Sequence, residues 1–158
     1  MKNVFYNIKN SKFLKFIRNA WHFRKELSDF YKWDYTYNLQ MLRRSLILTA
    51  DHIEKYGNEV DESRLLKVQN MRRTITLLDS VIEGDFIGQA EQILNIETKS
   101  DFKFEKCDDS NLSKMIDNLS DEDKENNKQI FALSDKLEEE QWKELWNIIN
   151  DDMKGWWD

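Results

Sequence analysis

The feature that most restricts the fold of this chain is the near absence of residues that break helices. Its 158 residues include no proline and only four glycines. Proline removes a backbone donor and glycine costs conformational entropy, so a chain nearly without them can form long helices. Apolar residues recur at intervals of three and four, which places them on one face of a helix. The sequence therefore predicts an all-α protein, a single domain over residues 1–158 built as a helical bundle.

The first half predicts the core of that bundle. We expect an N-terminal helix over about residues 3–31, long helices over 35–56 and 62–83, and a short helix from Asp85 to about Leu94. Because short connections favour antiparallel neighbours, the two long helices should form an antiparallel hairpin with the first helix packed across it. Residues 1–94 are thus interpreted as a basic helical core.

Several residues signal where these helices begin and end. Asp34 can accept hydrogen bonds from the first N–H groups of the helix over 35–56. Gly57 and Gly84 suit the left-handed position that follows many helices. Ser120 opens a sequence that resembles a capping box, which predicts a helix start there.

The second half is predicted as loops and short helices over 95–134, then an acidic, tryptophan-rich helix over 135–158. Residues 101–106 alternate aromatic and charged side chains, which is the period of a strand, but a lone strand has no partner in a helical chain. We therefore interpret residues 95–110 as an extended loop pinned by Phe102 and Phe104, with strand as the alternative. A short helix near 110–118 and a polar helix or loop to about Ser134 should follow.

The net charge of −6 conceals an asymmetry between the halves. Residues 1–80 hold 15 Lys and Arg against 9 Asp and Glu, whereas residues 81–158 hold 9 against 21. All seven arginines lie in the first half, and arginine suits the recognition of phosphate. Either an anion site lies in that half, or the basic half docks on the acidic half. Long nucleic acid fits neither interpretation, because the acidic half would repel its backbone.

The N-terminal segment is basic and amphipathic. Such a helix can lie on a membrane surface, but more often it packs on its own domain, and the second interpretation is favoured. No stretch approaches the roughly 18 apolar residues that a membrane span needs. Cys107 is the only cysteine, so no intramolecular disulfide can form and a reducing compartment such as the cytoplasm is expected.

No constellation of catalytic or metal-binding residues is recognisable. There is no Gly-x-Ser-x-Gly motif and no glycine-rich phosphate loop. Two histidines, His22 and His52, and one cysteine do not supply the four closely spaced ligands of a zinc site. We expect a protein that is not an enzyme and that uses neither a cofactor nor a metal.

Two surfaces remain as candidates for binding. Tyrosines and arginines near the start of the second helix could stack a base and grip phosphate, although aromatic residues at helical spacing more often belong to a core. The candidate ligand-binding residues are Trp33, Tyr35, Tyr37, Arg43, Arg44, Lys67, Arg72 and Arg73. The alternative is a protein contact, since tryptophan is enriched where interfaces gain most of their energy. Its residues are Trp142, Trp146, Trp156 and Trp157, and deleting residues 155–158 should abolish the contact without unfolding the chain.

Four short motifs are spread across the chain: Trp21-His-Phe-Arg24, Trp33-Asp-Tyr35, Leu42-Arg-Arg-Ser-Leu46 and Trp156-Trp-Asp158. Together they resemble motifs of small accessory proteins of tailed phages. The resemblance implies a phage product that acts in the bacterial cytoplasm by binding. We expect it to sequester a small anionic nucleotide used as an immune signal. The alternatives are inhibition of a host protein and helical oligomerisation, and a homo-oligomer is expected.

Overall fold

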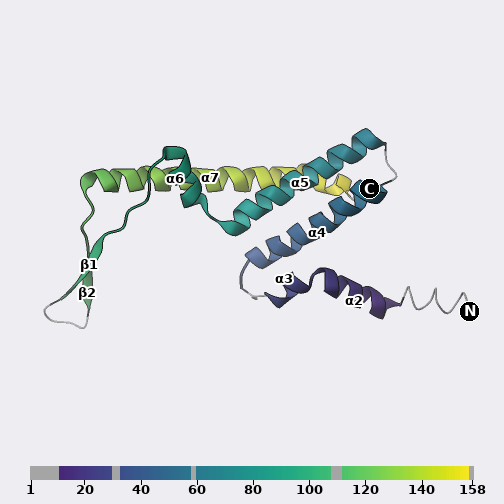
Figure 1. The fold of residues 1–158 in the computed structure, drawn as a ribbon, viewed down its shortest axis with the longest axis horizontal. Helices are drawn as coiled ribbons and strands as arrows, with labels where there is room; N and C mark the ends of the chain where they lie inside the picture. Colours follow the sequence, from purple (N-terminus) through teal and green to yellow (C-terminus); the bar gives the residue numbers. More distant parts are fainter. Residues whose placement is uncertain (1–10, 30–32, 58–59, 108–111, 157–158) are drawn as a thin grey trace, which may run out of the picture. The chain divides into compact units, whose positions relative to one another are not determined.

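The computed structural model describes residues 11–29, 33–57, 60–107 and 112–156. Most of these residues are helical, and the chain is all-α in class with one small two-stranded sheet (Figure 1). The chain separates into two compact units, one formed by residues 1–82 and 147–158 and the other by 83–146. The predicted helical bundle is therefore confirmed as a fold class.

The first unit is organised around helices α4 (Thr36–Tyr56) and α5 (Asp61–Glu83). One ion pair joins Arg43, early in α4, to Asp79, late in α5, and a second joins Asp51, later in α4, to Arg72, earlier in α5. This order confirms the predicted antiparallel hairpin, whose helices lie side by side in Figure 1. Its buried side chains are Leu39, Leu46 and Ala50 of α4 and Val68, Met71, Thr74, Ile75, Leu78 and Val81 of α5.

The end of the chain completes the core of this unit. Helix α7 (Asp121–Asp152) is followed by the 3-10 turn η1 (Met153–Trp156), and the Trp156 side chain is only 2% exposed. The Asn70 amide of α5 donates a hydrogen bond of 2.9 Å to the Asp152 carboxylate. Residues 152–156 therefore belong to the same folded unit as α5.

Two of the three predicted helix-end signals around the hairpin are confirmed, and one is wrong. The Thr36 N–H donates to the Asp34 carboxylate at 2.9 Å, and Gly84 has the left-handed φ of 67°. Gly57, by contrast, is extended, with φ −62° and ψ 134°. A Cβ at this position would lie 2.6 Å from the Ile53 carbonyl oxygen, so Gly57 is needed for space and not for a left-handed turn.

The N-terminal segment differs from its prediction. Its described part forms α2 (Lys12–His22) and α3 (Arg24–Ser28), separated at Phe23; residues 3–10, 30 and 31 of the predicted helix lie outside the described residues. No residue of α2 is buried. The expectation that this helix packs its apolar face on its own domain is therefore wrong, because α2 is held at its C-terminal end, where the His22 carbonyl accepts a hydrogen bond from Arg44.

The second unit contains helix α6 (Phe86–Leu94), strands β1 (Phe102–Lys106) and β2 (Ser113–Asp117), and α7 as far as residue 146. The strands are antiparallel, with Phe104 opposite Met115. The predicted extended loop at β1 and the predicted helix near 110–118 are both wrong, for one reason. The strand-like period of β1 does have a partner, and this partner is β2, which lies in the segment predicted to be helical. Phe102 and Phe104, which were expected to pack against the core, are both more than half exposed.

Helix α7 is a single element where a polar helix or loop and a separate helix from residue 135 were predicted. Its start is confirmed: the Asp123 N–H donates to the Ser120 hydroxyl at 3.1 Å, and that hydroxyl donates to the Asp123 carboxylate at 2.7 Å. No Gly or Pro interrupts residues 121–152, and Ser134 is buried inside the helix and does not end it. Asp85 likewise caps α6 by accepting a hydrogen bond from the Gly88 N–H.

Two absences apply to the parts of the chain that the structure describes. No helix there has the length and apolar content needed to cross a bilayer. No group of three or more His, Cys, Asp and Glu side chains there is arranged to hold a metal ion.

Candidate functional site

The arginines of the predicted ligand site point to different partners. Arg43 makes an ion pair through its Nε with Asp79 on α5. Its neighbour Arg44 turns toward α2, where its Nε donates to the His22 carbonyl oxygen at 2.9 Å. Two adjacent arginines on a helix leave it in directions about 100° apart, so they do not converge on one anion.

Arg72 is also engaged with carboxylates across the hairpin. Its Nη2 lies 2.5 Å from Asp51 Oδ1 and 3.0 Å from Glu54 Oε2. The hydrogen bond to Asp51, followed by that to Glu54, raises the pKa of Arg72 above its ordinary value. A phosphate at this place would have to compete with two carboxylates that already hold the guanidinium.

The remaining members of the predicted site are spread over the first unit. Trp33 and Tyr35 are 85% and 59% exposed at the start of α4, whereas Tyr37 is partly buried. Lys67 lines a small hollow of about 220 Å3 beside Asn70, Asp152 and Trp156. Arg73 lies on an exposed position of α5, next to Arg72 and so on a different face.

The hollow beside Arg43 has the wrong charge for an anionic ligand. It measures about 370 Å3 and is lined by Lys25, Glu26, Asp29, Gln40, Arg43, Asp79 and Ile82. Carboxylates outnumber cations among these residues, and one of the cations is paired with Asp79. This hollow does not gather positive charge.

Helix α7 carries a different kind of surface, which we term the tryptophan patch. The rings of Trp142 and Trp146 are stacked, with centroids 6.1 Å apart and planes 16° from parallel. They lie one turn apart on α7, and Trp146 is 51% exposed. The patch forms an open groove of about 620 Å3 lined by Asp135, Glu138, Glu139, Trp142, Lys143 and Trp146. It combines an apolar aromatic floor with a net negative rim.

Trp156, another of the predicted tryptophans, does not belong to this patch. Trp156 is buried in the first unit, so it is a core residue and its assignment to a partner surface is wrong. Trp157 lies outside the described residues. Deletion of residues 155–158 would remove the Trp156 ring from the core, so we now expect this deletion to destabilise the first unit. Position near the end of the sequence gave no indication of this burial.

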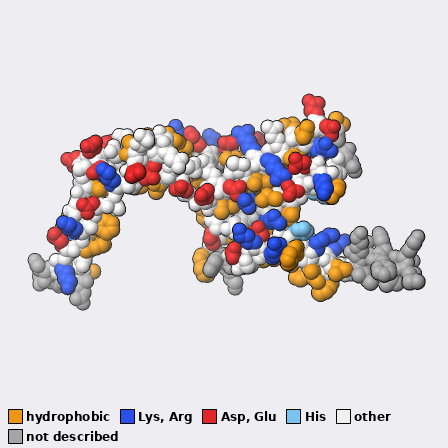
Figure 2. Space-filling view, in the orientation of Figure 1, with side chains coloured by type: hydrophobic (Ala, Val, Ile, Leu, Met, Phe, Trp, Pro, Cys, Tyr) orange, Lys and Arg blue, Asp and Glu red, His pale blue; other side chains and the backbone are white. Residues whose placement is uncertain are grey.

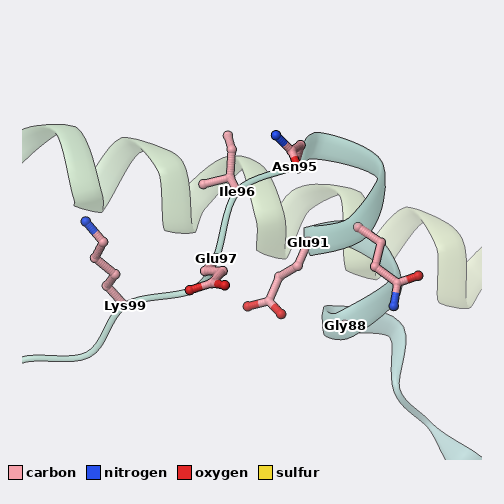
Figure 3. A pocket seen from close by; sticks show the side chains of 7 residues that line it. Gly88, Glu91, Asn95, Ile96, Glu97 and Lys99 are labelled. Carbon is pink, nitrogen blue, oxygen red and sulfur yellow. The ribbon is translucent and has the colours of Figure 1, made fainter.

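A polar hollow beside α6 was not predicted at all (Figure 3). It measures about 570 Å3 and is lined by Gly88, Glu91, Gln92, Asn95, Ile96, Glu97 and Lys99. The Thr98 N–H donates to Glu91 at 2.6 Å, and hydrogen bonding from Thr98 lowers the pKa of that carboxyl. Lys99 lies 2.7 Å from Asp123, which raises the pKa of Lys99 and, together with Ser120, lowers that of Asp123.

These contacts give the polar hollow a structural role, because they connect the segment that follows α6 to α7. The side chain of Asn127 on α7 accepts from the Lys99 N–H at 3.0 Å and donates to its carbonyl at 2.7 Å. The segment after α6 is thus fastened to α7 by backbone and ion-pair contacts. The lining holds no nucleophile next to a base, so no acid–base or covalent chemistry is apparent there.

The β1–β2 hairpin presents an exposed apolar face that the sequence did not indicate. Phe102 and Phe104 lie on one side of β1, with their ring centroids 5.6 Å apart, and Met115 lies opposite Phe104. These side chains are 52%, 65% and 59% exposed, respectively. Two strands alone are marginally stable, so this face gains from contact with another surface.

Comparison of the chain with protein-family models, with curated proteins and with solved structures finds no match.

Proposed function

We propose that this protein is a non-enzymatic binding protein whose tryptophan patch contacts a protein partner. The observation that carries the proposal is the half-exposed Trp146 ring, stacked on Trp142 and bordered by three carboxylates. Large aromatic side chains at the centre of a polar rim are the anchors of many protein interfaces. When a partner covers the ring, each Å2 of apolar surface removed from water stabilises the complex by about 25 cal/mol.

The charge of the rim defines the partner. Asp135, Glu138 and Glu139 outweigh Lys143, so the complementary surface is a basic segment with an apolar face. A helix that carries Lys or Arg beside apolar residues fits the open groove along α7. In the setting that the phage resemblance implies, that segment belongs to a host protein in the bacterial cytoplasm, and the phage protein acts as its inhibitor.

Sequestration of a nucleotide is the second candidate. It is favoured by the exposure of Trp33 and Tyr35, because such rings offer stacking area for a base. It is less well supported than the protein contact, because Arg43 and Arg72 would have to exchange carboxylate partners for phosphate. A thermal-shift screen against cyclic dinucleotides, cyclic oligonucleotides and ADP-ribose derivatives tests it. A rise that Arg43→Ala abolishes would support this candidate.

The protein contact is tested by affinity capture from bacterial lysate with wild-type protein and three variants. Trp146→Ala should weaken capture about 30-fold or more, since interface anchors contribute about 2 kcal/mol or more. Glu138→Lys/Glu139→Lys should weaken capture of a basic partner as well. Phe131→Ala is the matched control, because Phe131 is another exposed aromatic residue of α7, 45% exposed, outside the patch.

The proposal fails if Trp146→Ala captures the same partner as strongly as the wild type. It also fails if Phe131→Ala loses the partner equally, because the contact would then lie elsewhere on α7.

A further inference from the structure

Helix α2 presents an exposed apolar face. Its exposed large apolar side chains are Phe13 at 68%, Leu14 at 39%, Phe16 at 67%, Ile17 at 46% and Trp21 at 65%. At 3.6 residues per turn these positions fall on one side of the helix, within an arc of about 160°. Figure 2 shows the hydrophobic side chains on one side of this segment and the basic ones on the other.

The opposite side of α2 is basic throughout. Lys12, Lys15 and Arg18 lie there, and Lys12–His22 contains no Asp or Glu. At the end of the apolar face, the guanidinium of Arg24 lies 4.2 Å from the centre of the Trp21 ring. The helix therefore combines a wide apolar face with positive charge along its whole length.

This helix is formed without help from its apolar face. Ser11 caps it by accepting from the Leu14 N–H at 3.2 Å. Its other end is attached to the hairpin through the hydrogen bond between Arg44 and the His22 carbonyl. Neither the cap nor the attachment uses the apolar side chains, so both leave the apolar face open to solvent.

We propose that α2 binds in the plane of an anionic lipid bilayer, with its aromatic face in the interfacial region and its lysines toward the headgroups. A basic helix with a one-sided apolar face and low net hydrophobicity has the composition of an interfacial helix. The attraction is electrostatic as well as apolar, because Lys and Arg near a bilayer gain from its negative surface potential. A second α2 would bring like charge, so a pair of these helices is disfavoured.

This inference is independent of the tryptophan patch, which lies on α7 in the other unit. The experiment is co-sedimentation of the full chain with vesicles of phosphatidylcholine, with and without about one third phosphatidylglycerol. We expect the protein to sediment with the anionic vesicles and to dissociate from them as salt rises, because the Debye length falls from about 10 Å at 0.1 M to about 3 Å at 1 M.

Two α2 variants separate the apolar and the electrostatic contributions. Phe13→Ser/Phe16→Ser should weaken binding to anionic vesicles at least tenfold, since even partial burial of two rings is worth that much. Lys12→Glu/Lys15→Glu should remove the preference for anionic lipid. The matched control is Leu65→Ser/Leu66→Ser, two side chains of α5 that are 59% exposed.

Four outcomes overturn the proposal. The first is equal sedimentation with neutral and anionic vesicles, and the second is no sedimentation with either. The third is unchanged binding by Phe13→Ser/Phe16→Ser. The fourth is self-association of the wild type, measured by light scattering over a range of concentrations, that this variant abolishes, which would assign the face to a second copy. Circular dichroism of each variant checks that α2 and the hairpin remain folded.

Discussion

Replacement of Trp156 tests whether the end of the chain is part of the core. The ring is 2% exposed, and replacement of buried aromatic residues by alanine costs about 3–5 kcal/mol. Its Nε1 is buried without a hydrogen-bond partner among the described residues, so Trp156→Ala breaks no hydrogen bond and the whole loss comes from packing. At about 2–4 °C per kcal/mol for a chain of this size, the melting temperature should fall by roughly 6–20 °C.

Urea unfolding followed by far-UV circular dichroism measures this difference. Trp146→Ala is the control on α7, and it should lower the free energy of unfolding by less than Trp156→Ala does, because that ring is half exposed and its stacking on Trp142 is worth about 0.5–1.5 kcal/mol. Trp156→Phe keeps much of the volume and removes the unpaired donor, so it should cost less than Trp156→Ala. If Trp156→Ala and Trp146→Ala were equally stable, the assignment of residues 152–156 to the core of the first unit would be refuted.

Three further changes test local features by thermal melting. Gly84→Ala should destabilise the folded protein by about 1–2 kcal/mol, because a residue with a Cβ is strained at the left-handed φ of 67° that Gly84 adopts. Gly57→Ala should cost about 1–3 kcal/mol although its φ is ordinary, because the new Cβ would lie 2.6 Å from the Ile53 carbonyl oxygen; an unchanged melting temperature would contradict this. Hydrogen bonds from Lys99 and Ser120 lower the pKa of Asp123 in the folded protein. Between that lowered pKa and about 3.9, the ordinary value for Asp, this carboxyl binds more protons in the unfolded chain than in the folded one. The free energy of unfolding should therefore fall as pH falls through this window. Asp123→Asn should therefore flatten the melting profile between pH 5 and 2, and an unaltered profile would exclude the pair as its cause.

The concentration of arginine in the first half has a structural explanation. Arg43 and Arg72 pair with Asp79, Asp51 and Glu54, all of which also lie in the first half. These pairs join α4 to α5 and so fix the alignment of the hairpin. The pairing of Arg43 and Arg72 therefore accounts for part of the charge asymmetry without an anion site, and these two arginines do not dock on the acidic half.

Sequence spacing predicts which tryptophans of the proposed protein contact lie close together on a helix, but it does not predict which of them are exposed. Trp142 and Trp146 are four residues apart in a helical segment, so their stacking follows from local geometry. Trp156 looked equivalent in the sequence, yet it is buried against another part of the chain. Exposure depends on what the rest of the fold places beside a residue, and no local pattern carries that information.

The difference between local patterns and contacts made by distant residues also explains the errors in the predicted fold. The period of β1 was visible in the sequence, but a strand needs a partner, and the partner of β1 lies in a different segment, at residues 113–117. The apolar stripe of α2 predicted the helix correctly and its burial incorrectly, because the stripe shows which side is apolar and not what covers it.

By itself, the sequence determined the class of the fold, the extent of the two hairpin helices and most of their caps. These depend on interactions within a few residues: backbone hydrogen bonds to the fourth residue, capping side chains, and the absence of proline. Only the tertiary structure decided which carboxylates hold the arginines, which tryptophan is core and which is surface, and which strand pairs with β1. Those outcomes depend on contacts between residues far apart in the chain, whose geometry is fixed only when the helices pack.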